Sequence, residues 1–87
     1  MTNDAALARL YRVVAEIAGA SRTPADAGLD TPLADGGFWL DSVDLLELAV
    51  ACEQEFGVVF DGEADLAPPS LASVRSLAAL IERKGGR

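Results

Sequence analysis

The stretch that decides the fold is LDSVDLLELAVACEQEFG, residues 40–57 of an 87-residue chain. After its first leucine come an acid and a serine, which are common at helix N-termini, and the stretch closes with a glycine, which commonly follows a helix. These signals predict a helix over residues 42–56. At about 100° per residue, one apolar sector of this helix is expected to face a core, and its members are Leu45, Leu48, Ala49, Cys52 and Phe56.

The same helix has a second apolar sector, which lies roughly opposite the first and which we name the docking strip: Val43, Leu46 and Val50. Three acids flank it, namely Asp44, Glu47 and Glu53. A helix in a small domain needs only one apolar face, so a second face rimmed by acids indicates a surface that docks onto another protein. The alternative is that Val43 and Leu46 pack beneath the preceding loop.

Two more long helices are expected, one on each side of this segment. Apolar residues recur at spacings of three and four over residues 4–18, which predicts a helix capped by Thr2 or Asn3 and ending near Gly19. The last helix is predicted to begin after Ser73 as its N-cap. Its buried side chains are expected to be Val74, Leu77, Ala78, Leu80 and Ile81.

The connections between these helices differ in length. Residues 20–40 hold two prolines and three glycines with little periodicity. This pattern predicts a long ordered loop, and a loop of that length in a small domain is usually functional. Its expected anchors are Leu29, Leu33 and Phe38. Residues 61–66 are predicted to form a short turn of helix, which ends before the two prolines at 68–69.

A chain of this size builds one hydrophobic core, so we expect a single domain over residues 1–87. Its only strand-like pattern, at residues 58–60, is too short to pair alone. The predicted fold class is all-α, a small bundle of three long helices plus one short helix.

Composition narrows the function further. Seven basic and fourteen acidic residues give a formal net charge of -7, which disfavours nucleic acid and membrane as partners and favours basic protein surfaces. The chain has no histidine, so the commonest general base and metal ligand is missing. We therefore expect no catalytic set and no metal site. The start of the chain, MTND, has no secretory-signal pattern, which favours a cytoplasmic setting.

Cys52 is the single cysteine, so it has no partner for a disulfide within the chain. It falls on the core sector of the helix at 42–56, where a free thiol behaves as a small hydrophobic side chain. We predict that Cys52 is buried.

We expect the functional site at the junction between the long loop and the helix at 42–56. Either Ser42 or Asp41 caps that helix. A hydroxyl at a helix N-terminus is exposed, and a phosphate attached to it lies in the favourable field of the helix dipole. An enzyme that uses Asp41 and Asp44 as acid and base is the competing interpretation, but the chain offers no histidine and no second layer around a pocket.

At these residues the sequence resembles the acyl carrier protein family, the acyl or aminoacyl/peptidyl carriers of a 4'-phosphopantetheine arm. The family's Asp-Ser-Leu/Ile motif at the start of its second helix is matched by DSV at 41–43, and the acidic-apolar run that follows it by DLLEL at 44–48. The resemblance continues through EQEFG at 53–57 to Ser73, Val74 and Leu77. It therefore covers the whole domain.

The resemblance implies a role for each residue of the motif. Ser42 is expected to receive phosphopantetheine from coenzyme A, in a reaction that a separate magnesium-dependent phosphopantetheinyl transferase performs, with Asp41 beside it. The positions expected to meet partner enzymes are Trp39, Val43, Asp44, Leu46, Glu47 and Val50. Trp39 departs from the family, which usually has glycine three residues before the serine, and Val43 replaces its Leu or Ile.

Such a carrier holds an intermediate as a thioester and presents it to successive enzymes, and it catalyses nothing itself. Its expected partners are the transferase and acyl- or aminoacyl-loading and condensing enzymes with basic docking surfaces, and the carrier itself is expected to be a monomer. Trp39 and an Ala/Arg/Gly-rich composition favour polyketide, nonribosomal peptide or other specialised biosynthesis. The alternatives are a fatty-acid acyl carrier protein and a carrier-like helical adaptor without prosthetic group.

Overall fold

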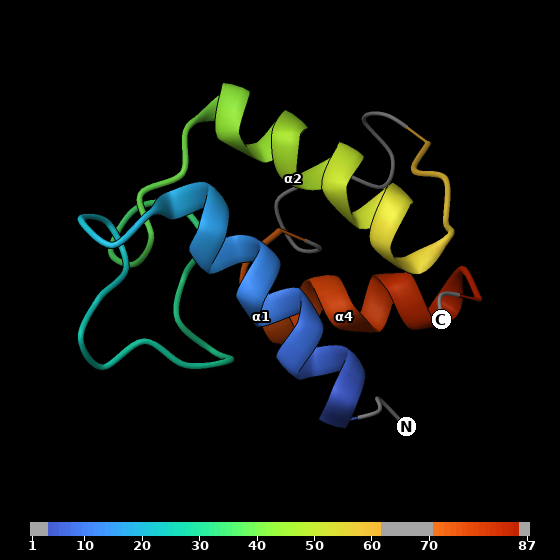
Figure 1. Cartoon of the computed structure of the whole chain (residues 1–87), viewed down its shortest axis with the longest axis horizontal. Coiled ribbons are helices and arrows are strands. Elements are labelled where there is room, and N and C mark those ends of the chain that lie inside the picture. Colours follow the sequence, from blue (N-terminus) through green and yellow to red (C-terminus); the bar gives the residue numbers. More distant parts are fainter. Residues whose placement is uncertain (1–3, 62–70, 86–87) are drawn as a thin grey trace.

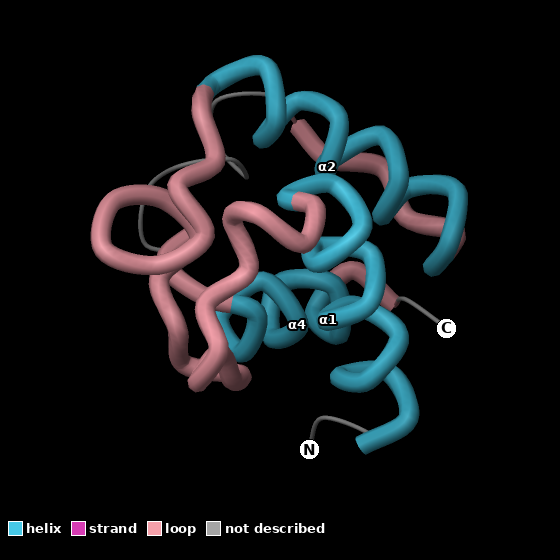
Figure 2. Tube along the Cα trace, turned by 60° about the vertical axis from the view of Figure 1, so that its left-hand side comes forward, coloured by secondary structure: helices cyan, strands magenta, loops and turns pink. Residues whose placement is uncertain are grey.

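The structure is a computed structural model, and it describes residues 4–61 and 71–85. Its helices are α1 (Asp4–Ala18), α2 (Ser42–Phe56) and α4 (Val74–Arg83). Helix α1 packs against both of the others. The long connection from α1 to α2 gathers at the end of the molecule where α1 finishes and α2 begins (Figures 1 and 2). The start of α2 therefore stands at the junction of a helix end and an ordered loop.

The all-α prediction is confirmed for the described residues, in which no strand forms. One isolated bridge, between Pro32 and Ser73, joins the long loop to the start of α4. The predicted bounds of the first two helices agree with α1 and α2. The expected cap at Thr2 or Asn3 lies outside the described residues, as does the expected short helix beyond Asp61. No helix in the described ranges is long and apolar enough to cross a membrane.

One hydrophobic core is shared by the three helices and the loop. The predicted core sector of α2 is confirmed, because Leu48, Cys52 and Phe56 are buried and Leu45 and Ala49 pack against them. The other helices and the loop contribute further fully buried side chains, among them Leu10, Val14, Leu33, Phe38, Val74 and Leu77.

The prediction that Cys52 is buried is confirmed, since its side chain is 0% exposed. Burial, with smaller contributions from Glu55 and Glu53, raises the pKa of its thiol to about 12. The thiol therefore stays protonated near neutral pH, and thiolate chemistry at this position is suppressed.

Backbone hydrogen bonds order the loop that precedes α2. Phe38 N donates to Pro32 O at 2.9 Å and Leu40 N to Leu33 O at 3.0 Å, which folds the segment back on itself. Leu33 N in turn donates to Ala72 O at 3.1 Å, next to α4. The ring of Phe38 meets Tyr11 of α1 edge to face, with centroids 6.1 Å apart. The prediction of an ordered loop pinned by Leu29, Leu33 and Phe38 is thus confirmed, with Leu33 and Phe38 fully buried and Leu29 half-buried against the core.

Candidate functional site

The start of α2 is fixed by a capping box. Asp44 N donates to Asp41 Oδ1 at 2.8 Å, and Asp41 N donates to Asp44 Oδ2 at 3.1 Å. The N-cap is therefore Asp41, and Ser42 is the first residue of the helix. Of the two candidate residues, Asp41 therefore caps α2, and the Ser42 side chain makes no capping bond.

The surroundings of Ser42 fit the attachment of a phosphate group. Its side chain is exposed, and it makes no hydrogen bond to any side chain in the described ranges. Backbone N–H groups in the first turn of a helix lack intrahelical acceptors, and they lie at the positive end of the helix dipole. A phosphodiester on this exposed hydroxyl would lie in that field, beside the first-turn N–H groups that Asp41 does not cap, and would displace no core side chain.

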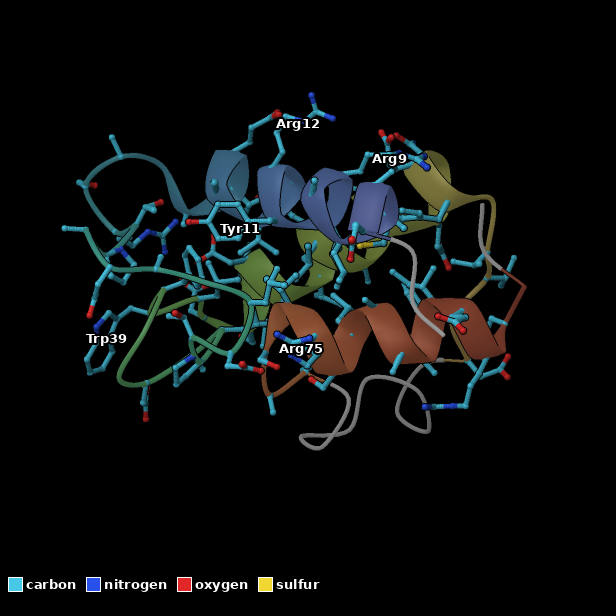
Figure 3. The ribbon with its side chains drawn as sticks, turned by 90° about the horizontal axis from the view of Figure 1, so that it is seen from below. Arg9, Tyr11, Arg12, Trp39 and Arg75 are labelled. Carbon is cyan, nitrogen blue, oxygen red and sulfur yellow. The ribbon has the colours of Figure 1, made fainter. Side chains whose placement is uncertain are left out.

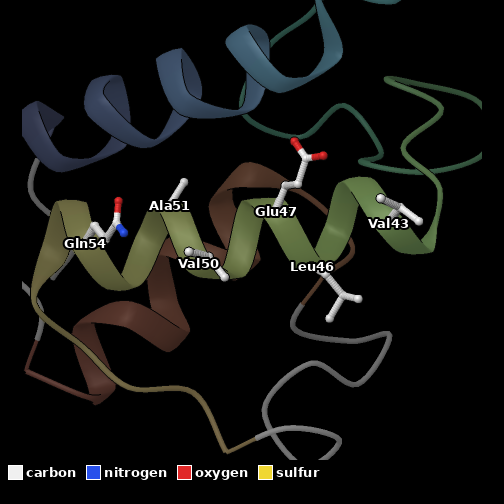
Figure 4. A pocket seen from close by; sticks show the side chains of 6 residues that line it. All are labelled: Val43, Leu46, Glu47, Val50, Ala51 and Gln54. Atoms are coloured by element: carbon white, nitrogen blue, oxygen red, sulfur yellow. The ribbon is translucent and has the colours of Figure 1, made fainter.

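The docking strip runs along the outer face of α2 and is open to solvent. Val43 and Leu46 are each 61% exposed and Val50 is 53% exposed. The alternative in which Val43 and Leu46 pack beneath the preceding loop is therefore wrong. The strip borders a shallow groove (Figure 4) whose lining residues are Val43, Leu46, Glu47, Val50, Ala51 and Gln54.

Glu47 is the acid that lies beside the docking strip with its carboxylate available. It is exposed, and it has no ion-pair partner within residues 4–61 and 71–85. The other acids of the predicted rim, Asp44 and Glu53, bond to residues of the chain itself. Arg22 pairs with Asp44, and Glu53 accepts a hydrogen bond from Phe60 N at 2.9 Å. Of the three acids predicted to flank the docking strip, Glu47 is therefore the one whose carboxylate remains available to a partner.

Asp44, which the sequence places among the partner-binding residues, turns its carboxylate toward Arg22. Arg22 Nη1 and Asp44 Oδ2 are 2.6 Å apart, and the Asp44 side chain is 15% exposed. The hydrogen bond from Arg22, with that from Asp41 N, lowers the pKa of the Asp44 carboxyl. Sequence reasoning did not single out Arg22. The signal was that Arg22 is the one basic residue in the loop from 19 to 41.

Trp39 lies two residues before the cap, with its side chain 58% exposed. It points away from the helices at the edge of the loop (Figure 3). Its φ of 58° lies in the left-handed region, where glycine is favoured. The backbone conformation at this position therefore suits the glycine that is usual in the family that the sequence resembles, and this chain has the same position occupied by an indole side chain.

A pair of variants at position 39 measures this backbone strain. Trp39→Gly and Trp39→Ala both delete the indole, but only alanine keeps a Cβ at positive φ, which costs roughly 1–2 kcal/mol. Glycine's greater freedom in the unfolded chain offsets roughly half of that difference. We expect Trp39→Gly to be more stable than Trp39→Ala by about 1 kcal/mol in urea denaturation. Equal stabilities, or a more stable alanine variant, would show that the backbone at Trp39 is not strained.

The structure thus groups the predicted residues along one element. Asp41 and Ser42 begin α2, the docking strip and Glu47 continue along its exposed face, and Trp39 precedes it. No group of three or more metal-ligating side chains occurs in the described part of the chain.

Comparison with known proteins identifies the family. A family model described as the phosphopantetheine attachment site matches residues 8–83. No curated protein and no solved structure gives a significant match. Carriers of this family hold 4'-phosphopantetheine covalently on a serine, and they present it to other enzymes without being catalytic themselves. Because the match spans most of the chain, the resemblance found in the sequence is confirmed, and the protein belongs to the phosphopantetheine-binding family of carrier proteins.

Proposed function

We propose that this protein holds biosynthetic intermediates as thioesters on a 4'-phosphopantetheine arm attached to Ser42, and delivers them to partner enzymes. The observation that carries the proposal is the placement of Ser42, which is exposed at the first residue of α2 while Asp41 performs the capping. Among the other described serines, Ser73 and Ser76 form the capping box of α4 and Ser21 lies in the loop. Of the serines that the structure describes, Ser42 is the one that combines exposure with the start of a helix.

The rest of α2 supports delivery to partners. The arm, when attached, supplies a thiol that holds the intermediate, and the docking strip with Glu47 brings the carrier to each enzyme. Weak docking suits this task because a carrier bound too tightly by one enzyme does not reach the next. We propose Trp39, Val43, Leu46, Glu47 and Val50 as contacts with partners. Asp44, held by Arg22 and the cap, contributes to the site by fixing the start of the helix.

The direct test of the proposal is modification of the wild-type protein. It is incubated with coenzyme A, magnesium and a broad-specificity phosphopantetheinyl transferase, and its intact mass is measured. We expect the mass of one phosphopantetheine group to be added, and none when coenzyme A is omitted. A protein that stays unmodified with several such transferases would support the helical adaptor without prosthetic group.

We propose that this carrier serves a specialised pathway, polyketide or nonribosomal peptide synthesis, in preference to fatty-acid synthesis. An exposed indole at Trp39, in the place of a glycine, changes the surface that a partner meets beside Ser42. The experiment compares loading of the modified carrier by malonyl-transferring enzymes of fatty-acid synthesis with loading by adenylating enzymes that activate amino acids or other acids. Efficient loading and elongation by the enzymes of fatty-acid synthesis would contradict the proposal.

We further propose that the carrier acts as a cytoplasmic monomer.

Two substitutions separate the apolar and the charged parts of docking. Leu46→Ala removes exposed apolar surface, so it is expected to weaken binding to a partner enzyme by about tenfold at any salt concentration. Glu47→Lys replaces attraction to a basic surface with repulsion, so its loss is expected mainly in the association rate and should shrink as salt is added. The measurement is binding kinetics over a salt series.

Glu16→Lys is the matched control for the charge change, because Glu16 is exposed on α1 and the docking strip lies on α2. Neither Leu46→Ala nor Glu47→Lys should change the melting temperature appreciably. If Leu46→Ala lowers stability as much as Leu48→Ala, about 2–5 kcal/mol, Leu46 belongs to the core and the docking strip is misplaced.

A further inference from the structure

Arg22 joins the end of α1 to the start of α2. Its Nε donates to Ala18 O at 3.0 Å and its Nη2 donates to Ile17 O at 3.1 Å. Its Nη1 donates to Asp44 Oδ2 at 2.6 Å. One guanidinium therefore bonds with three acceptors on two helices.

Both helix ends favour this contact. The last carbonyls of a helix lack intrahelical donors and lie at the negative end of its dipole, where a cation is stabilising. On the other side, the Asp44 carboxylate receives a charge-assisted hydrogen bond, which is stronger than one between neutral groups. A planar guanidinium offers several donors at fixed angles, which a lysine ammonium does not.

Further hydrogen bonds connect Asp44, which Arg22 holds, to Asp41 on the other side of Ser42. Asp44 Oδ2, which Arg22 holds, also accepts the backbone N–H of Asp41 at 3.1 Å. Asp44 N donates to Asp41 Oδ1 at 2.8 Å. Asp41 and Asp44, on either side of Ser42, are thus tied to each other, and the Asp44 carboxylate is tied to the end of α1 through Arg22.

We propose that Arg22 is a positioning residue for the modification of Ser42: through Asp44 and the cap it holds the first turn of α2 in the orientation in which the transferase uses the serine hydroxyl. This inference rests on the proposed function of Ser42. Arg22 itself touches neither the hydroxyl nor any reacting atom, and it acts through the backbone that carries Ser42.

The chain supplies a matched control at the other end of α2. Arg9 of α1 also bonds across to α2, with its Nε at 2.9 Å from Glu55 Oε2 and its Nη2 at 2.7 Å from Glu55 O. Figure 3 shows Arg9 at this end of α2. Arg9→Ala removes a link between the same two helices without touching the start of α2.

The first experiment compares the wild type with Arg22→Ala, Arg22→Lys and Arg9→Ala as substrates of a phosphopantetheinyl transferase, at a temperature where all four are folded. We expect Arg22→Ala to lower kcat by about tenfold or more, as misplacement of a reacting group does, with little change in KM because the docking strip is intact. Arg22→Lys should recover part of kcat. Arg9→Ala should lower the melting temperature and leave kcat unchanged.

The second experiment needs no transferase. Titration of the Asp44 carboxyl by NMR should show a pKa below its ordinary value in the wild type and in Arg9→Ala, and a higher pKa in Arg22→Ala. Amide hydrogen exchange in the first turn of α2 should become faster only in Arg22→Ala.

The outcomes distinguish the inference from the function on which it rests. Unchanged kcat in Arg22→Ala, or an equal loss in Arg9→Ala, would overturn the role of Arg22 and leave the proposed function standing. Absence of modification in the wild type would contradict the proposed function and, with it, the positioning role.

Discussion

Substitution of Ser42 by alanine is expected to abolish modification by coenzyme A and a transferase while the protein stays folded. Asp41 caps α2, so removal of the serine hydroxyl takes away no capping bond, and a change at an exposed helix position usually alters stability by less than about 0.5 kcal/mol. Intact mass measures the modification and thermal unfolding measures the stability. A variant that unfolds readily would show that Ser42 supports the fold.

Two controls sharpen this prediction. Ser21→Ala removes another exposed serine, in the loop, and it should be modified as well as the wild type. Asp41→Ala removes the cap itself and should lower the stability by about 1 kcal/mol. Retention of the added mass in Ser42→Ala would reject Ser42 as the attachment site.

Among glycine-to-alanine substitutions in the loop that precedes α2, Gly37→Ala is expected to cause the largest loss of stability. A Cβ at Gly37 would overlap the carbonyl oxygen of Pro32 and would lie 2.9 Å from Cγ2 of Thr31. That carbonyl accepts the hydrogen bond from Phe38 N, so it cannot move without breaking the turn that leads to α2. We expect a loss of about 3 kcal/mol or more.

Urea denaturation measures this effect, and Gly28→Ala is its control. A Cβ at Gly28 meets no atom within 4 Å, so that variant should stay within about 0.5 kcal/mol of the wild type. If Gly37→Ala costs no more than Gly28→Ala, the loop does not approach itself as closely as the structure shows.

The helices and the two faces of α2 could be predicted from the sequence because they depend on local periodicity. The spacing of Leu48, Cys52 and Phe56 identifies the buried face, and that of Leu46 and Val50 identifies the exposed one. These relationships hold along a single helix, so they do not depend on the rest of the fold.

The details at the start of α2 could not be predicted, because they depend on contacts between distant residues and on backbone angles. The choice of Asp41 over Ser42 as N-cap follows from the extended backbone at Asp41. The pairing of Asp44 with Arg22 joins residues 22 positions apart, and periodicity carries no information on such a pair. The positive φ of Trp39 likewise follows from the turn that the loop makes there.

The most direct test of the central claim is to locate the prosthetic group on the modified wild-type protein by fragmentation mass spectrometry. We expect the added phosphopantetheine on Ser42, in the fragment that contains the start of α2. Its presence on any other serine of the chain, with Ser42 unmodified, would contradict the assignment of Ser42 as the attachment site.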